Sequence, residues 1–541
     1  MTSPADPAYI TTPIYYVNDR PHIGHVYTTT VCDVWARFMR RAGRDVMFLT
    51  GTDEHGVKVE KSAVERGVSP QQHADENAAE FRRVLGMFSL TNDAFIRTTE
   101  PAHEHQVQAF IRRLQDAGAI YLGEFEGWYD EGQEEYHTET KAAELEFKSP
   151  ISGKPLIRAT EKNYYFKLSA FQARLEKLFA ENPHLVQPDA RRNEVLGRLR
   201  EGLNDVPISR TNFTWGVPMP DDPGHVIYVW IDALLNYVSA LGLGDADGVP
   251  AGLAEGEDPA AAAARRAGYW PPAVQVLGKE ILWFHAVIWP AMLMALEMPL
   301  PKLIYAHSFW VSEGQKMSKS LGNFIDLEAL QGYLDTYGID ALRWYLITQG
   351  PLGATDADFR AEQFHDVYGA DLVNTVGNSC SRVTAMITKY YDGVVPSEVV
   401  DGERMVVADH NWPVLVEDAV ARAMSAMERF EPAVAVQEGM ALVRVVDAFI
   451  NDTAPFKIAK DETRRDELGA ILYQCIEALR IANLLLEPVL PERSAEFLAA
   501  IGCEPPAGGT FASLCGWGGL KPGTTVQKVA LYPRVEMVAE A

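Results

Sequence analysis

The chain has 541 residues, 47% of them hydrophobic and 23% charged, a composition typical of a globular protein with two to four domains. Five cysteines without closely spaced pairs argue against a disulfide framework and indicate a reducing cytoplasm. The net charge of −25 excludes a broad basic surface, so a nucleic acid should bind at a confined site. We expect no signal peptide and no membrane partner, because the most apolar run, 281–296, is too short to cross a bilayer.

The N-terminal residues predict a strand, a loop, a helix and a second strand. Residues 8–12 and 46–50 are short and apolar, as buried strands are, and apolar residues recur at helical spacing between 24 and 41. The loop before this helix reads Pro21-His22-Ile23-Gly24-His25. The unpaired N–H groups at a helix N-terminus suit a phosphate, and a glycine there lets a flat ligand lie on the backbone. For two histidines taken alone, simple capping of the helix is the more frequent role.

Polar residues follow the second strand. The run is Gly51-Thr52-Asp53-Glu54-His55-Gly56. Open α/β sheets bind ligands at the carboxyl ends of their strands, so Asp53 is a candidate ligand-binding residue. The structural alternative, in which Asp53 caps the next helix, is equally frequent. This first half of the sheet should end near residue 118.

Residues 119–222 are predicted to form an insertion between two halves of the sheet. Their first part is rich in acidic and aromatic residues, 149–155 predicts a turn, and 164–179 has helical periodicity. The sheet resumes with a strand at 226–230, and Asp232 should cap a helix that ends near Leu241. Residues 242–266 predict a surface loop with a short helix.

A further strand, 273–277, leads into Gly278-Lys279-Glu280 and a helix that begins at Ile281. Ile281, His285 and Trp289 are spaced to share one face of that helix. The alternative for this face is ordinary core with one satisfied histidine. Strand 303–307 follows and leads toward a glycine- and serine-bracketed loop. The loop contains Lys316-Met317-Ser318-Lys319-Ser320, which taken alone is compatible with a solvated basic turn.

After about residue 358 the sequence becomes mainly helical. The helices are predicted at 364–389, 412–430, 433–451, 465–486 and 492–501. Their short connections favour an antiparallel bundle. Residues 526–533 should form an extended segment that docks back onto the catalytic body.

Several of these motifs together resemble a known family. His-Ile-Gly-His at 22–25 and Lys-Met-Ser-Lys-Ser at 316–320 resemble, in this order and at this separation, the two signatures of class I aminoacyl-tRNA synthetases. The segments 52–56, 228–237, 279–285 and 289–293 are similar to those of the methionyl-tRNA synthetases, and the resemblance covers nearly the whole chain. The cysteine-free segments 124–129 and 161–166 resemble the form of the family whose connective peptide holds no zinc.

The resemblance implies an α/β fold with a Rossmann-type parallel-sheet catalytic domain, split by a connective-peptide insertion and followed by an α-helical anticodon-binding bundle. The implied domains are 1–118 and 223–307 for the two halves of the catalytic domain, 119–222 for the insertion, 308–360 for the KMSKS loop and stem-contact region, and 361–541 for the bundle with its C-terminal segment. The implied reaction is activation of methionine by ATP to methionyl-adenylate and pyrophosphate, then transfer to the 3′ end of tRNA.

The resemblance also assigns roles position by position. The catalytic residues would be His22, His25, Lys316 and Lys319. ATP would be bound by His22, Gly24, His25, Gly278, Glu280 and Lys319. Methionine would be bound by Ile14, Tyr16, Asp53, Trp230, Leu234, Tyr237, Ile281, His285 and Trp289, with Asp53 holding the α-ammonium group. The anticodon would be read by Asn378, Arg382 and Phe456, where the family usually has tryptophan in place of Phe456.

Cofactors and partners follow from the same resemblance. Mg²⁺ is expected on the ATP phosphates, and no structural zinc is expected because residues 119–222 contain no cysteine. The expected partners are methionine, ATP and tRNA, without DNA, for a monomer in the cytoplasm. The alternatives are a nucleotidylyltransferase, a non-catalytic tRNA-binding relative, and a class I synthetase for leucine, isoleucine, valine or cysteine. The helical C-terminal half argues against the first alternative, and the short insertion argues against the branched-chain enzymes.

Overall fold

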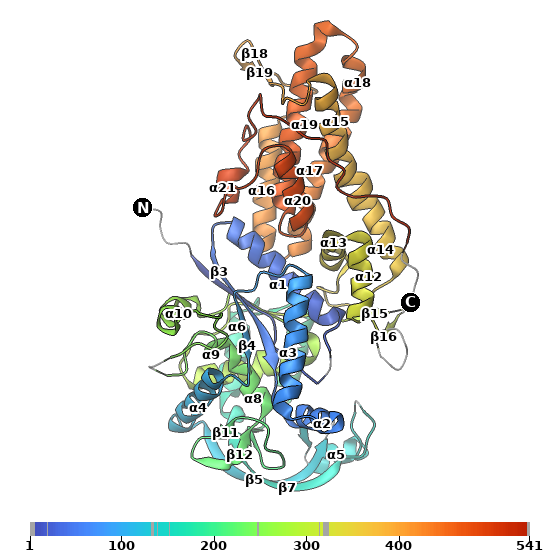
Figure 1. Ribbon diagram of the computed structural model, residues 1–541. Coiled ribbons are helices and arrows are strands. Elements are labelled where there is room, and N and C mark those ends of the chain that lie inside the picture. The colour runs from blue at the N-terminus through green and yellow to red at the C-terminus, as the bar shows by residue number, and fades with distance from the viewer. Residues whose placement is uncertain are drawn as a thin grey trace.

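The computed structural model describes residues 6–537 except 19, 131–134, 138, 151, 246–247, 313 and 318–323. Helices of the C-terminal half gather at one end of the molecule, and the sheet and the strands of the insertion lie at the other (Figure 1). Helix α1 (Ile23–Arg41) lies between these two parts. The predicted α/β fold class with a helical C-terminal half is therefore confirmed.

The central sheet has seven strands, all parallel where they pair. They are β1 (Pro7–Thr11), β2 (Tyr15–Tyr16), β3 (Asp45–Asp53), β4 (Ala94–Arg97), β8 (Val186–Gln187), β13 (Val274–Gly278) and β14 (Ile304–His307). Both β1 and β2 pair with one side of β3, while β4 pairs with the other side. The sheet then continues from β1 through β13 and β14 to β8. The strand order thus changes direction between β1 and β13, which is where sheets of this kind bind ligands.

Helices connect and cover these strands. They are α1, α2 (Val57–Arg66), α3 (Pro70–Met87), α4 (Pro101–Asp116), α8 (Val229–Leu234), α9 (Asn236–Ser239), α10 (Pro259–Arg266) and α11 (Trp289–Ala295). Helix α2 begins after Gly56, so Asp53 is the last residue of β3 and does not cap that helix. The capping alternative for Asp53 is therefore wrong.

The predicted insertion is built mainly on antiparallel strands, with β5 and β7 farthest from the bundle (Figure 1). Its elements are β5 (Ile120–Asp130), β6 (Glu135–His137), α5 (Glu139–Glu144), β7 (Ile157–Phe166), α6 (Gln172–Glu181), α7 (Asp189–Leu199), β9 (Val206–Pro207), β10 (Ser209–Arg210), β11 (Pro218–Met219) and β12 (Asp222–Ile227). The predicted helix at 164–179 is wrong in its first part, because 164–166 pair with β5 as a strand. Strand β8 also comes from this range, yet it pairs with β14 of the central sheet.

Two further predictions fail between residues 226 and 241. The strand ends at Ile227, and Trp230 already belongs to helix α8. Asp232 is an internal residue of α8 and caps no helix; its carboxylate is buried and contacts two histidines. The sequence is continuously apolar from the strand into the buried helix. The hydrophobic period therefore does not change at the boundary, and the sequence does not reveal it.

The described residues of the range 308–360 form a small three-stranded sheet and two helices. These are β15 (Trp310–Ser312), β16 (Gln315–Lys316), β17 (Ala357–Asp358), α12 (Leu327–Tyr337) and α13 (Ile339–Gln349). The bundle follows, close to the predicted helices. It comprises α14 (Ala361–Val367), the π-helix Tyr368–Gly377, α15 (Asn378–Tyr390), α16 (Trp412–Glu428), α17 (Pro432–Thr453), α18 (Pro455–Ile458), α19 (Arg465–Leu486), α20 (Pro491–Ala500) and α21 (Phe511–Leu514), with a short hairpin of β18 (Val399–Val400) and β19 (Glu403–Arg404).

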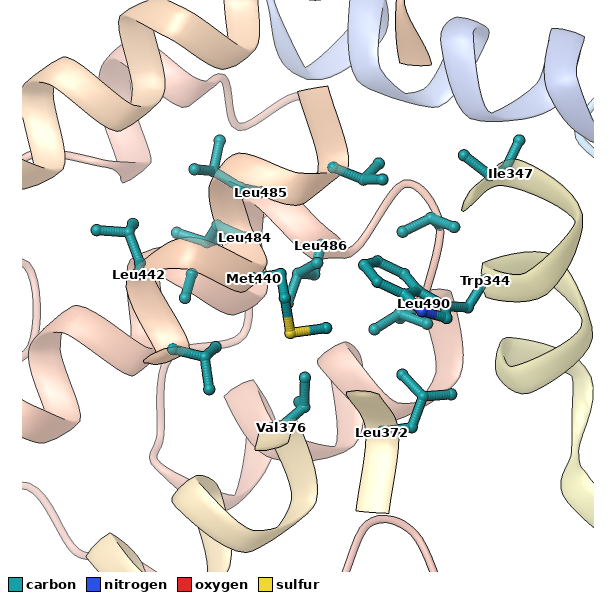
Figure 2. Close-up of a cluster of buried hydrophobic side chains, with 14 of the residues drawn as sticks. Trp344, Ile347, Leu372, Val376, Met440, Leu442, Leu484, Leu485, Leu486 and Leu490 are labelled. Atoms are coloured by element: carbon teal, nitrogen blue, oxygen red, sulfur yellow. The ribbon is translucent and has the colours of Figure 1, made fainter. Parts of the chain in front are cut away.

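One continuous hydrophobic core joins the bundle to the catalytic part. Figure 2 shows a part of it, where Trp344 of α13 lies beside Met440 of α17 and Leu486 of α19. Helix α19 is long and apolar enough to cross a membrane, and its apolar window is entirely buried inside the protein, as in a core helix. A buried ion pair also connects the two parts: fully buried Asp33 of α1 contacts Arg343 of α13 at 2.6 Å.

The C-terminal segment docks on the bundle and not on the catalytic sheet, which corrects the prediction for residues 526–533. The Tyr368 hydroxyl donates to the carbonyl of Pro533 at 2.6 Å, and the Gln527 amide donates to the carbonyl of Ala500 at 2.8 Å. The buried side chains of Val526 and Leu531 explain this position, since they extend the hydrophobic core that the bundle helices share.

Candidate functional site

A cavity of about 380 Å³ opens at the carboxyl edge of the central sheet. This volume falls in the range of small-molecule sites. Its walls come from the β1–β2 loop, the N-terminus of α1, the ends of β3, β13 and β14, and helices α8 and α9. The lining residues are Pro13, Ile14, Tyr15, Tyr16, His22, Gly24, His25, Thr28, Asp53, Lys58, Val229, Trp230, Ala233, Leu234, Tyr237, Gly278, Glu280, Ile281, His285, His307 and Phe309.

The two motif histidines form one corner of this cavity. His22 is the N-cap of α1, and its Nδ1 accepts from the Gly24 amide at 3.1 Å. The Nδ1 of His25 accepts from the His22 amide, also at 3.1 Å, and the two ring centroids are 3.9 Å apart. Because each Nδ1 is an acceptor, each Nε2 carries a proton. Both rings therefore offer an N–H donor beside a helix N-terminus, which suits phosphate oxygens.

The charge state of this corner follows from its surroundings. Burial, followed by the nearby His22 ring, lowers the pKa of His25 well below its ordinary value, so His25 is neutral at pH 7. Gly24 keeps the corner open, because a Cβ there would lie 2.9 Å from Cε1 of His22. Capping and ligand binding are thus compatible, since the cap uses Nδ1 and leaves the Nε2 protons in place.

His307 closes the same corner from the end of β14. Its Nδ1 donates to the Ser308 carbonyl at 2.7 Å, and its Nε2 lies 2.8 Å from the Thr28 hydroxyl of α1. Burial lowers the pKa of His307 to about 4, so this ring is also neutral at pH 7. His307 was not among the site residues predicted from the sequence. Its position at the carboxyl end of a predicted parallel strand could have indicated a ligand-binding role.

Gly278 and Glu280 at the end of β13 build the wall beside His307, since Gly278 is the register partner of His307 on β14. The carboxylate of Glu280 folds over Gly278 so closely that a Cβ on Gly278 would lie 2.4 Å from Oε2. Lys279 points elsewhere: its Nζ lies 2.6 Å from Asp356 and 4.6 Å from the centroid of the Phe309 ring. Residue 278 must therefore be glycine for the carboxylate to take this position.

Asp53 and a set of apolar side chains form the deeper part of the cavity. Asp53 is 6% exposed and is the register partner of Tyr16. Trp230 of α8 stacks on Phe284 with ring centroids 4.3 Å apart, and Ile14, Leu234 and Ile281 complete the apolar surface. A carboxylate beside a mainly apolar wall suits an amphiphilic ligand with one cationic group.

Tyr237 and His285 meet at the bottom of this part. The Nδ1 of His285 donates to the Ile281 carbonyl at 3.0 Å, so its Nε2 accepts from the Tyr237 hydroxyl at 2.7 Å. Burial lowers the pKa of His285 to about 4, which keeps this tautomer neutral. The hydroxyl proton of Tyr237 is thus directed to His285.

Trp289 does not line the cavity, although the helical spacing predicted that it shares a face with His285. Its ring is 1% exposed and packs behind Tyr237, with centroids 6.0 Å apart. The cause is the π-helix Phe284–Ile288, whose wider turn holds one more residue and rotates Trp289 out of the predicted face. Trp289 therefore supports the cavity wall from behind.

The remaining predicted residues lie outside the cavity or outside the described residues. Lys319 is not among the described residues, and nothing is described of the Lys316 side chain, although Lys316 belongs to β16. Asn378 and Arg382 lie one turn apart on α15, where Asn378 is exposed and Arg382 contacts Asp447 at 3.6 Å. Phe456 is the second residue of α18 and is 46% exposed.

Comparison with known proteins identifies the family. The profile described as tRNA synthetases class I (M) matches residues 8–144 and 140–384. Methionine–tRNA ligase of Halalkalibacterium halodurans is 40% identical over 98% of this chain and 79% of its own length. The enzyme of Bacillus subtilis is 39% identical over 98% of this chain and 78% of its own length. The chain belongs to the methionyl-tRNA synthetase family.

Solved structures of this synthetase family match the whole fold. Mycobacterium tuberculosis methionyl-tRNA synthetase in complex with methionyl-adenylate has a TM-score of 0.87 and 34% identity, covering 98% of this chain and 100% of that chain. Its apo form has a TM-score of 0.83 and 32% identity, covering 99% of both chains. The resemblance drawn from the sequence motifs is confirmed.

Most of the residues predicted to bind ATP and methionine share one cavity of this chain. Besides His307, seven lining residues were not predicted from the sequence as site residues: Pro13, Tyr15, Thr28, Lys58, Val229, Ala233 and Phe309. Each lies within a few residues of a recognised motif or of a strand end. Among the described residues, no group of three or more His, Cys, Asp and Glu side chains is arranged to hold a metal ion.

Proposed function

We propose that this chain joins methionine to its tRNA in two steps, through a methionyl-adenylate formed in the cavity at the sheet edge. The main observation behind this proposal is that hydrogen-bond donors suited to a phosphate, a buried carboxylate and an apolar wall line one cavity of about 380 Å³. A methionyl-adenylate has the matching parts, namely a phosphate, an ammonium group and an apolar side chain. The related Mycobacterium tuberculosis structure, which contains methionyl-adenylate, supports this proposal.

In the first step, a carboxylate oxygen of methionine attacks the α-phosphorus of ATP, and pyrophosphate leaves. The carboxylate is already ionised at pH 7, so the step requires no general base and no protein nucleophile. The chain's contribution is to orient the reactants and to stabilise the charge that develops on the phosphates. His22 and His25 supply Nε2–H donors for the phosphate oxygens, and Gly24, Gly278 and Glu280 frame the adenosine. ATP enters as its magnesium complex, and Lys316 and Lys319 complete the phosphate site.

Methionine specificity is assigned to the deeper part of the cavity. Asp53 binds the α-ammonium group, while the side chain lies along Trp230 and Tyr237. A long, polarizable thioether makes favourable contacts with aromatic rings. A pocket distinguishes ligands that differ by one methylene by only about 1–3 kcal/mol, so homocysteine should be the main competitor.

In the second step, a hydroxyl oxygen of the terminal ribose of tRNA attacks the activated carbonyl, AMP leaves and the hydroxyl proton is released, while the bundle recognises the anticodon. We assign this recognition to Asn378, Arg382 and Phe456. The exposed Phe456 ring offers a stacking surface, and Arg382 and Asn378 offer hydrogen-bonding groups one turn apart on α15. The ion pair with Asp447 would hold the Arg382 guanidinium in place.

The proposal has three further parts. The chain is a monomer, it is located in the cytoplasm, and it binds neither stoichiometric zinc nor DNA nor a membrane. The absence of cysteine from residues 119–222 supports the zinc assignment, and the unpaired cysteines support the location. Sedimentation and elemental analysis of the purified protein test the first and third properties.

Aminoacylation is the experiment that tests the whole proposal. The chain should charge tRNA specific for methionine with labelled methionine, and should not charge tRNAs of other specificity. Charging of another tRNA with another amino acid at a comparable rate would contradict the proposal.

A further inference from the structure

We propose that His55, Asp232 and His103 form a positioning network that fixes the two ends of the methionine site relative to each other. The Asp232 carboxylate lies between two imidazoles: Oδ2 is 2.7 Å from Nδ1 of His55, and Oδ1 is 2.8 Å from Nε2 of His103. All three side chains are at most 3% exposed. The inference rests on the proposed function, because it concerns how methionine is held.

The network joins elements that carry different parts of the site. His55 follows Asp53, the proposed ammonium ligand, by two residues. Asp232 belongs to α8, between Trp230 and Leu234, which line the apolar part of the cavity. His103 comes from α4. The network therefore connects the end of β3 directly to the helix that carries the side-chain pocket.

His103 extends the connection to the next helix. Its Nδ1 lies 2.7 Å from the hydroxyl of Ser239 in α9, the helix that also carries Tyr237. The Ser239 hydroxyl in turn lies 3.2 Å from the Asn236 carbonyl. Two walls of the methionine pocket, α8 and α9, are thus tied to one buried carboxylate and one histidine.

The residues around His55 point in different directions, which gives each a separate role. Asp53 lines the cavity, whereas Glu54 turns away and accepts from Arg97 at 2.7 and 2.9 Å. The Trp215 indole donates to the Glu54 carbonyl at 2.7 Å. His55 is therefore the residue whose side chain links this segment to α8.

The charges in the network favour a role in geometry over one in stability. Burial alone would raise the pKa of Asp232, but the charge of His55 and hydrogen bonds from both histidines lower it to about 2. Burial alone would lower the pKa of His55, but Asp232 and then Glu104 raise it to about 10. A buried ion pair at neutral pH is no more stabilising than well-packed apolar groups, whereas its directional bonds define one arrangement.

The part of the cavity that we assign to ATP is built from other elements than the network. His22 caps α1, Gly24 lies in its first turn and Gly278 ends β13; neither α1 nor β13 contributes a residue to the network. Loosening the network should therefore weaken methionine binding more than ATP binding. None of the three residues lines the cavity, so they act through Asp53 and α8 and not on the substrate.

The experiment is methionine-dependent ATP–pyrophosphate exchange, with KM measured separately for methionine and for ATP. Asp232→Asn removes the charge at nearly constant shape and should raise the KM for methionine roughly tenfold or more, since small misplacements of a bound substrate are costly. The KM for ATP should change less than about twofold. Ser239→Ala, a milder change at the far end of the network, should shift the same ratio in the same direction by a smaller factor.

Glu477→Gln is the matched control, because Glu477 is also a fully buried carboxylate and pairs with Arg480 at 2.7 Å inside the bundle. It should lower the Tm without changing the ratio of the two KM values. The inference is overturned if Asp232→Asn and Ser239→Ala change only the Tm, as the control does, or raise both KM values equally. A parent protein without methionine-dependent exchange would instead refute the proposed function itself.

Discussion

Replacement of Asp53 by asparagine tests the assignment of the ammonium site. The substitution preserves the shape of a side chain that is only 6% exposed, so packing at the end of β3 should be little changed. It removes the negative charge that we assign to the α-ammonium group of methionine. A hydrogen bond to a charged group contributes about 1.5–3 kcal/mol, which corresponds to roughly 10- to 150-fold in affinity.

The assay is ATP–pyrophosphate exchange at saturating ATP, with methionine varied over a wide range. We expect the KM for methionine to rise by that factor and the KM for ATP to stay nearly constant. Asp45→Asn is the control, because Asp45 lies at the other end of the same strand and accepts from the Tyr269 hydroxyl at 2.8 Å. A KM for methionine within about threefold of the parent, or an equal rise for ATP, would refute the assignment.

Three other predictions follow from the site and the bundle. Trp230→Ala should raise the KM for methionine at least about fivefold, because aromatic contacts of this kind contribute about 1 kcal/mol; an unchanged KM would remove the ring from the pocket. Phe456→Ala and Arg382→Ala should weaken tRNA charging by about 1–3 kcal/mol each and leave pyrophosphate exchange intact; equal loss of both reactions would mean that these residues support the fold. Burial lowers the pKa of His285 and His307 to about 4 from an ordinary value of 6.5, so the unfolded chain binds more protons below pH 6.5. The free energy of unfolding should therefore fall as the pH drops from 6.5 to 4, by up to about 3 kcal/mol for each histidine. Urea titrations should show a smaller fall in His285→Asn and in His307→Asn than in the parent. The same profile in the parent and both variants would contradict this.

Much of the fold was predictable because hydrophobic periodicity marks strands and amphipathic helices. The helices of the bundle were predicted within a few residues, since each presents an apolar stripe to one shared core. The errors fall where local pattern and tertiary pairing disagree. Residues 164–166 have a spacing compatible with a helix, yet their pairing with β5 makes them a strand. Asp232 follows an apolar strand as a helix-capping residue would, yet its buried carboxylate forms hydrogen bonds with two histidines that are distant in the sequence.

The candidate site was predictable to the extent that its residues lie in short motifs. A helix start and a strand end made His22, Gly24, His25 and Asp53 candidates, and the resemblance of their motifs to the synthetase family assigned their roles. His307 was not identified, because its role depends on a contact with Thr28, which lies 279 residues away in the chain. The position of Trp289 could not be predicted from a period of 3.6, because the π-helix that displaces it leaves no mark on the hydrophobic pattern.

The most direct test of the account is amino-acid-dependent ATP–pyrophosphate exchange, measured with the purified chain and each of the twenty amino acids. The cavity formed by Asp53, Trp230 and Tyr237 predicts strong exchange with methionine alone. Equal or greater exchange with leucine, valine or cysteine would contradict the central claim.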